Sequence, residues 1–245
     1  MNFNLKSAKI KRVLRRTMVF LIGILTLILV ILKFPQFLFI HQAESKSIVV
    51  YSTQPIPNSV YPLMDRAIEK LRDSEFYSED LSHKVFLCNS RMLYVLLSYP
   101  SKTTFAGNNV LTGNIIVAEA DIDSNLSYRS KDERTRDLDN LIVHEIVHTF
   151  LFTQLGVKKY FNLPAWKNEG YCDYIAGAST VSSAEEITMI CNDQNPGNYS
   201  YYRIAIEYLI REKGLSIDEI ISGNFNYRAL IDSAKLKHCF REILP

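Results

Sequence analysis

Two histidines and a glutamate stand at a spacing that could do chemistry, in the run His144-Glu145-Ile146-Val147-His148. Residues four apart on a helix lie about 40° apart around its axis, so both imidazoles point the same way and can bind one ion. Neutral imidazole is a good zinc ligand, and Glu145 is placed to face a metal-bound water. The alternative is a solvated helix face, but the surrounding helix is heavily apolar and these polar groups need buried partners. We therefore predict a zinc site with His144 and His148 as ligands and Glu145 as general base.

A zinc site that hydrolyses a substrate needs a third protein ligand and one open position. A third histidine after a short spacer is absent, because no histidine follows His148 until His238. The next predicted helix instead carries Glu169, with twenty residues between it and His148. Asp173 shares the helical face of Glu169 and could accept a hydrogen bond from a ligand imidazole, which would fix the orientation of the ring. We predict Glu169 as the third ligand and Asp173 as the supporting carboxylate; the alternative for both is a solvated helix face.

Together the two segments resemble the signature of a known enzyme family. The runs His144-Glu-Ile-Val-His148 and Asn168-Glu169-Gly-Tyr-Cys-Asp173 are similar to the H-E-x-x-H and N-E-x-x-x-D motifs of the gluzincins, the thermolysin-like or peptidase MA-like zinc peptidases. The resemblance covers about residues 105–223. It implies a zincin fold, one zinc ion held by two histidines and a glutamate, and attack of water on a peptide carbonyl. The glycine-rich substrate motif of the zinc aminopeptidases does not occur in the sequence.

The family resemblance also implies a residue that stabilises the oxyanion. In gluzincins this residue is a tyrosine or histidine beyond the third ligand. The tyrosine-rich run that precedes Tyr208-Leu209 is similar to the aminopeptidase pattern and maps Tyr199 onto the catalytic tyrosine. Tyr202 stands where the family usually has a small residue, and an ordinary packing role is the alternative for Tyr199.

Two predicted helices must position the candidate site residues. Apolar residues at helical spacing indicate a helix over 137–155, which Gly156 ends, and Pro164 opens the helix that carries residues 166–176. Further helices are expected at about 199–213 and after a capping box at Ser216 to Glu219.

The first half of the chain reads differently, as strands with one helix. Strands are expected at 48–51, 84–88 and 114–118, and a helix over 60–71. Strands followed by helices indicate an α+β fold. We expect an N-terminal mixed sheet together with the active-site helix, followed by an all-helical C-terminal lobe. We divide the chain into a basic tail and anchor over 1–40, a linker and first strand over 41–58, and a zincin-like domain over 59–245.

The N-terminal segment has the features of a membrane span. Residues 17–32 carry no charge, and after Lys33 the apolar run continues to Ile40. A bilayer core needs roughly 20 apolar residues, so residues 17–40 span it only if Lys33 snorkels towards a surface. The basic residues before the span should stay in the cytoplasm, which places the rest of the chain outside. We predict an uncleaved single-pass anchor with Phe34, Phe37 and Phe39 near the outer interface; a cleaved signal peptide and a buried helix are the alternatives.

The charge distribution and the cysteine content bear on the class of partner and on the possible disulfides. No acidic residue precedes Glu44, and outside the first 33 residues 21 basic groups face 26 acidic ones, so the exported part does not fit a nucleic-acid binder. The four cysteines permit two disulfides with three connectivities, or four free thiols; they are Cys88, Cys172, Cys191 and Cys239.

Two functions fit these observations. The first is a membrane-anchored zinc peptidase that cleaves a peptide or protein substrate outside the cytoplasm. The second is a non-catalytic zincin-like domain used for binding or assembly, against which Glu145 argues because a binding site needs no general base. An intramembrane protease does not fit, since the predicted metal-binding helix begins with charged residues and lies far from the hydrophobic span.

Overall fold

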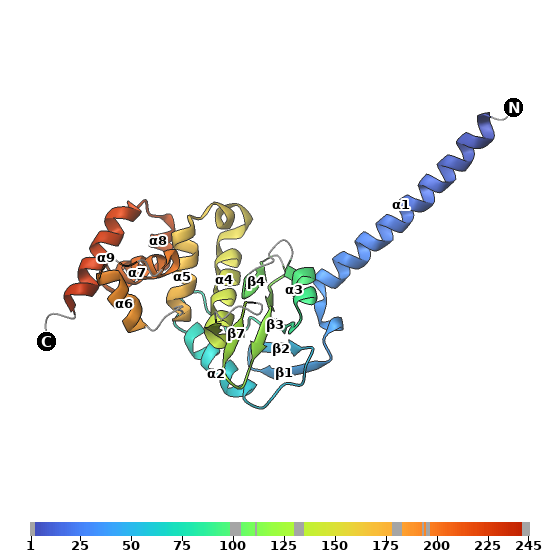
Figure 1. Ribbon diagram of the computed structural model, residues 1–245. Helices are drawn as coiled ribbons and strands as arrows, with labels where there is room; N and C mark the ends of the chain where they lie inside the picture. The colour runs from blue at the N-terminus through green and yellow to red at the C-terminus, as the bar shows by residue number, and fades with distance from the viewer. Residues whose placement is uncertain are drawn as a thin grey trace.

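The computed structural model describes residues 3–98, 104–110, 112–129, 135–177, 183–192, 194 and 197–241. It has an N-terminal apolar helix, a mixed β-sheet in the N-terminal part of the domain and a helical C-terminal part (Figure 1). The predicted α+β class is therefore confirmed.

The N-terminal helix α1, Phe3–Lys33, runs away from the rest of the chain (Figure 1). Its segment Lys11–Lys33 is long and apolar enough to cross a membrane, and none of the most apolar stretch is buried. A helix of this length measures about 34 Å, slightly more than a bilayer core of about 30 Å. The interpretation of this segment as a buried core helix is therefore wrong, while a membrane anchor and a signal sequence both fit.

The chain that follows α1 does not lie wholly at the surface. A short 3-10 helix η1, Pro35–Leu38, leads into strand β1, His41–Ser45, which forms within the stretch expected to be a linker. Phe37 is 80% exposed, whereas Phe39 is buried and its ring lies 5.1 Å from that of Phe86. Of the three phenylalanines expected near an outer interface, Phe39 thus belongs to the core.

The main sheet has five strands in the order β1-β2-β3-β5-β4. The three central strands are parallel, and β1 and β4 pair antiparallel at the two edges. The three predicted strands correspond to β2, β3 and β5. The strands that follow β1 in this sheet are β2 Ile48–Ser52, β3 His83–Leu87, β4 Ala106–Asn109 and β5 Asn114–Val117. A small antiparallel sheet follows, with β6 Glu119–Asp121, β7 Leu126–Tyr128 and β8 Thr135–Asp137.

The side chains of the central strands alternate between two apolar clusters. In β3, Val85 and Leu87 join the larger cluster, whereas Phe86 belongs to a second cluster on the other face. In β5, Ile115 and Ile116 are divided in the same way. Since successive side chains of a strand point to opposite faces, the sheet separates two layers. Helix α2, Val60–Leu71, which the sequence predicts, covers the larger cluster with six buried apolar residues at helical spacing, and helix α3, Arg91–Ser98, covers the second.

Helix α4, Leu138–Asn162, crosses the same face of the sheet as α2. The predicted end at Gly156 appears as a break, because Gly156 has φ 70° and ψ 169°, after which a short second segment runs to Asn162. Helix α5, Ala165–Ala176, begins after Pro164 as predicted and packs against α4. The remaining helices are α6 Ser183–Cys191, α7 Asn198–Arg211, α8 Ile217–Ser222 and α9 Tyr227–Arg241.

The C-terminal helices show the outcome of two sequence predictions, the capping box and the pairing of the cysteines. The capping box predicted at Ser216 and Glu219 is present at the start of α8. A disulfide joins Cys191 at the end of α6 to Cys239 in α9, while Cys88 and Cys172 are free and buried. One of the two disulfides that the sequence permits is therefore formed.

Helices α5 and α7 approach each other closely at Gly170. A Cβ atom at this position would lie 2.6 Å from the carbonyl oxygen of Tyr202 and 2.9 Å from a side-chain carbon of Ile206. The absence of a side chain at Gly170 thus allows α7 to pack directly against the helix that carries Glu169 and Asp173.

Gly170→Ala tests this packing by the sign of its effect. In an open helix interior, replacing glycine with alanine stabilises by about 1 kcal/mol. At Gly170 we expect a loss of about 1–3 kcal/mol in the free energy of unfolding, because the new methyl group overpacks against the backbone of α7. Chemical denaturation of the two proteins measures the difference, and a stabilised variant would contradict the close α5–α7 contact.

Candidate metal centre

Two imidazoles face each other on the buried side of α4. His144 is 4% exposed and His148 is 8% exposed, and their Nε2 atoms lie 3.1 Å apart. The four-residue spacing places both rings on one side of the helix, as the sequence predicts. The apolar neighbours Val143, Ile146 and Val147 are fully buried and hold this part of α4 in the core.

A third potential ligand lies beside the histidine pair. His144, His148 and Cys172 are all buried, and each offers a ligand atom such that the three atoms lie within 4.8 Å of one another. This group could hold a metal ion. Cys172 comes from α5, and its sulfur lies 3.3 Å from Nδ1 of His148, the ring nitrogen that does not face His144.

Glu169 approaches the same histidine pair from its other side. Its Oε2 atom lies 3.3 Å from Nε2 of His144 and 3.6 Å from Nε2 of His148. With the 3.1 Å between the two nitrogens, these distances form a nearly regular triangle. Two ligands at about 2.0–2.1 Å from a tetrahedral zinc ion stand about 3.3 Å apart, so the triangle has the size that such an ion requires. Burial opposes ionisation of Glu169, but its hydrogen bonds to both imidazoles lower the pKa of the carboxyl group.

A buried carboxylate orients His144. Nδ1 of His144 donates a hydrogen bond of 2.7 Å to Oδ1 of Asp173, which is 2% exposed, and Arg136 lies 3.5 Å from the same oxygen. Burial disfavours the imidazolium form of His144, but the Asp173 carboxylate outweighs burial and raises the pKa of His144 to about 10. The hydrogen bond leaves Nε2 as the nitrogen of His144 that faces His148 and Glu169.

Three groups meet at Nδ1 of His148. Oδ1 of Asn168 lies 3.1 Å away, the hydroxyl of Tyr160 lies 3.2 Å away, and the sulfur of Cys172 lies 3.3 Å away. Asn168 accepts a hydrogen bond from Nδ1 of His148. This bond directs Nε2 of His148 towards His144 and Glu169. Tyr160 reaches this position from the second segment of α4, and burial raises the pKa of its hydroxyl, so the oxygen stays protonated.

The two donor sets share the histidines and differ in the third atom. Burial first, and then the carboxylates of Glu169 and Asp173, raise the pKa of Cys172 well above its usual value. The group that faces both Nε2 atoms is the carboxylate of Glu169. Cys172 instead faces the nitrogen that Asn168 already binds.

Glu145 lies between the two histidines in sequence and is 8% exposed. Its backbone carbonyl accepts a hydrogen bond from the side chain of Asn108, which also donates to Thr149 at 2.8 Å. Asn108 belongs to the edge strand β4, so these bonds fix α4 to the edge of the sheet. No described residue donates a hydrogen bond to the Glu145 carboxylate, which leaves it available to accept one.

Tyr199 lies in the first turn of α7 and is 50% exposed. Burial first, and then the carboxylates of Glu169 and Asp173, raise the pKa of its hydroxyl to about 12. Tyr199 therefore lies in the electric field of the centre and remains a proton donor at neutral pH. Tyr201 instead donates to the carbonyl of Gln194 at 3.4 Å, and the ring of Tyr202 meets that of Tyr227 edge to face, with the centroids 5.7 Å apart.

The structure brings together five of the six predicted site residues on α4 and α5, and Tyr199 lies on α7, which packs against α5. Three groups that surround Nδ1 of His148 were not predicted as site residues from the sequence. Asn168 and Cys172 share the helical face of Glu169 and Asp173, so their spacing carried a usable signal. Tyr160 carried none, since its position depends on the break at Gly156.

Comparison with known proteins adds no family assignment. No model of a known protein family matches the chain, and no curated protein matches it significantly in sequence.

The shared role of the histidine pair gives a direct test of metal binding. His148→Ala removes a ligand from either donor set, so we expect the purified protein to lose its metal. His83→Ala is the matched control, because His83 is also buried, at 3% exposure, but lies in β3 away from the centre. Elemental analysis of both variants measures the metal content. Full metal content in His148→Ala, or equal loss in both variants, would contradict a centre at this pair.

Proposed function

We propose that this chain is a zinc peptidase of the gluzincin kind with a zincin fold, in which His144, His148 and Glu169 hold one zinc ion. The observation that carries the proposal is the triangle of 3.1, 3.3 and 3.6 Å formed by two Nε2 atoms and one carboxylate oxygen. The Nδ1 atoms of the two rings donate hydrogen bonds to Asp173 and Asn168, which hold the rings in the orientation that this set needs. Three protein ligands leave a fourth position open, which is the arrangement of catalytic zinc sites.

In the proposed site, the zinc ion and the side chain of Glu145 have different roles in hydrolysis. Zinc at such a site lowers the pKa of a bound water towards neutrality and polarises a carbonyl group. Glu145 accepts the proton of the attacking water, and later delivers it to the leaving amine. Its buried setting supports this role, and no residue in the described part of the chain donates a hydrogen bond to its carboxylate.

Tyr199 is the candidate that stabilises the negative charge on the carbonyl oxygen. Its hydroxyl keeps its proton, because its pKa is raised to about 12, and it can therefore donate a hydrogen bond throughout neutral pH. Neither alternative tyrosine has this relation to the centre, since Tyr201 bonds to Gln194 and Tyr202 packs near Tyr227. Half exposure allows Tyr199 to reach a substrate from the solvent side.

A peptide or protein substrate suits the surroundings of the centre. Strand β4 lies at the edge of the main sheet, and Asn108 of this strand bonds to the backbone of Glu145. An extended peptide can add to an exposed sheet edge through its main-chain groups. Such a peptide on β4 would pass next to the general base.

Three observations support a domain outside the cytoplasm and anchored by α1. The helix is long and apolar enough to span a membrane, and its basic residues precede the span. The Cys191–Cys239 disulfide fits an oxidising compartment. Cleavage of α1 as a signal peptide after Ala43 would remove the buried ring of Phe39 and most of strand β1. The proposed partners are thus a membrane and a polypeptide, and nucleic acid is not among them.

The third ligand is tested by comparing Glu169→Ala with Cys172→Ser. In the proposed site Glu169→Ala removes a ligand and should abolish stoichiometric zinc, whereas Cys172→Ser should retain about one zinc per chain. Zinc content after dialysis against a weak chelator measures both. If Cys172→Ser loses the metal and Glu169→Ala keeps it, the centre is a His-His-Cys site and the peptidase proposal fails.

Glu145→Gln separates catalysis from metal binding. The substitution keeps the shape of the side chain and all three ligands, so zinc should stay bound while turnover falls by about 10² or more, the scale of a positioned base. The assay uses a peptide found by screening a library against the unsubstituted protein. Cleavage at an unchanged rate would leave a binding or assembly domain as the better description.

Tyr199→Phe tests the role of the hydroxyl. Loss of one donor to the developing oxyanion should lower kcat by about 10²–10³ and leave KM nearly unchanged. Tyr201→Phe is the matched control, because its hydroxyl already bonds to Gln194, and it should cleave at the normal rate. If the control loses activity and Tyr199→Phe does not, the assignment moves to Tyr201.

A further inference from the structure

We propose that one face of the domain lies in the headgroup region of the membrane, so that α1 is a rigid mount and not a flexible tether. The η1–α3 face consists of exposed apolar side chains on the segment after α1 and on helix α3, namely Phe34, Phe37, Leu38, Ile40, Met92 and Leu96. This inference rests on the anchoring role proposed for α1, but it depends neither on zinc nor on peptidase activity.

The end of α1 is fastened to the domain. Ile31 and Leu32 pack against the second apolar cluster, which contains Phe86 and Phe39. The side chain of Asn114 in β5 donates to the backbone carbonyls of Leu32 at 3.4 Å and Lys33 at 3.5 Å. These are carbonyls of the last helical turn, which lack partners within the helix. A helix end held by both packing and hydrogen bonds transmits its orientation to the sheet.

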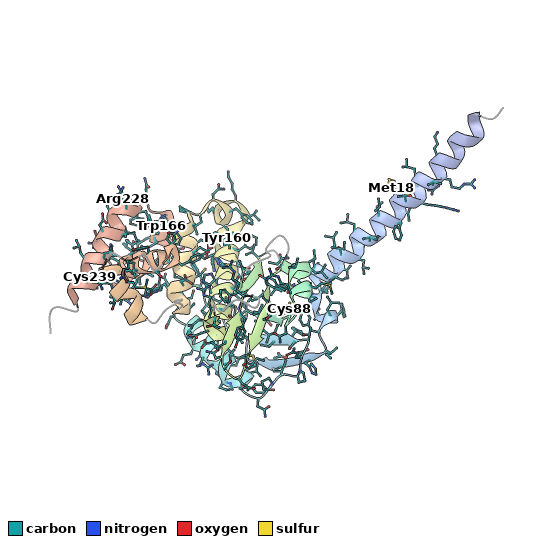
Figure 2. The ribbon with its side chains drawn as sticks, in the orientation of Figure 1. Met18, Cys88, Tyr160, Trp166, Arg228 and Cys239 are labelled. Atoms are coloured by element: carbon teal, nitrogen blue, oxygen red, sulfur yellow. A yellow bond between two sulfur atoms is a disulfide. The ribbon has the colours of Figure 1, made fainter. Side chains whose placement is uncertain are left out.

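Helix α3 is part of the same junction. Its inner side chains Tyr94 and Leu97 belong to the cluster that receives Ile31 and Leu32. Figure 1 shows α3 beside the end of α1, and in Figure 2 Cys88 of this cluster lies there too, away from Tyr160 of the metal centre. The outer side of α3 is therefore adjacent to the point where the chain leaves the bilayer.

The apolar side chains of the η1–α3 face are highly exposed, so they would contact water if no membrane covered them. Phe37 is 80% exposed, Ile40 is 82% exposed and Met92 is 83% exposed. Met92 and Leu96 are four residues apart and lie on one side of α3. Contiguous exposed apolar side chains mark contact with a partner or a membrane. Continuity with the apolar helix α1 favours the lipid surface as this partner.

The charged group at the junction fits the same position. The ammonium of Lys33 lies 5.5 Å from the centre of the Phe34 ring, a cation–π distance. A lysine with its stem on apolar groups and its head at the polar boundary is typical of the membrane interface. Aromatic side chains are enriched at the same depth.

Seating on this face places the metal centre on the far side of the sheet. The η1–α3 face adjoins the second cluster, whereas α4 packs on the cluster of the opposite face. The centre is then held at a fixed distance from the bilayer and is directed towards the aqueous phase. The substrate class that this mount serves is soluble or surface polypeptide, and not a segment buried in lipid.

Fluorescence quenching in vesicles tests the mount on the full chain. Single cysteines are placed by Phe37→Cys and Met92→Cys, labelled with an environment-sensitive dye and reconstituted in phosphatidylcholine vesicles that contain a headgroup-level nitroxide lipid. The matched control is Val157→Cys, since Val157 is 58% exposed on α4. Leu25→Cys in α1 reports on the anchor in parallel vesicles whose nitroxide is carried on the lipid acyl chain, because residue 25 lies well inside the span Lys11–Lys33. The native free cysteines are buried, and the unsubstituted protein corrects for their labelling.

Interfacial apolar groups lie about 5–10 Å deep, so quenching at 37 and 92 should be at least about twofold stronger than at 157. Equal quenching at 92 and 157, with strong quenching at 25, would overturn the mount and leave the anchor intact. Weak quenching at 25 as well would overturn both the mount and the anchor. Peptide cleavage is not part of this measurement, so its outcome is separate from that of the peptidase assays.

Discussion

The hydrogen bond between His144 and Asp173 is the interaction on which the site depends. Both groups are almost completely buried, and a buried polar group without a partner costs on the order of 1–3 kcal/mol. The bond therefore fixes how α5 lies against α4. Once α5 is in this position, Glu169 and Asn168 fall beside the two histidines without further adjustment. Gly170 then allows α7, which carries Tyr199, to close on the outer side of α5.

The main sheet connects this site to the N-terminal apolar helix α1 and also keeps the two apart. Alternate residues of β3 and β5 supply two apolar layers, one beneath α4 and one against the end of α1. The same strands therefore carry both helix α4 with the candidate metal centre and the proposed mount. With this division, the proposed mount and the candidate metal centre lie on opposite faces of the sheet.

Local signals in the sequence predicted the elements that carry the site. Six apolar residues at helical spacing define α2, and the capping box at Ser216 and Glu219 defines the start of α8, because each signal is complete within one element. The histidine spacing on α4 and the Glu169–Asp173 spacing on α5 are local in the same sense. Their meeting in space could be expected only because the break after Gly156 reverses the chain between two helices.

Features that depend on contacts between distant segments could not be predicted. Strand β4 has the sequence Ala-Gly-Asn-Asn, which carries no strand pattern, and it forms because it pairs with β5 and binds α4 through Asn108. The pairing of Cys191 with Cys239 follows from the packing of α6 on α9. Phe39 reads as part of a hydrophobic span, but it is buried against Phe86 because the chain turns back at Pro35–Leu38.

X-ray absorption spectroscopy at the zinc edge, on the zinc-loaded full chain, tests the central claim most directly. A zinc ion held by His144, His148 and Glu169 should show a first shell made only of nitrogen and oxygen at about 2.0–2.2 Å, with the outer-shell pattern of two imidazoles. A sulfur atom at about 2.3 Å would identify Cys172 as a ligand in place of Glu169 and would contradict the account.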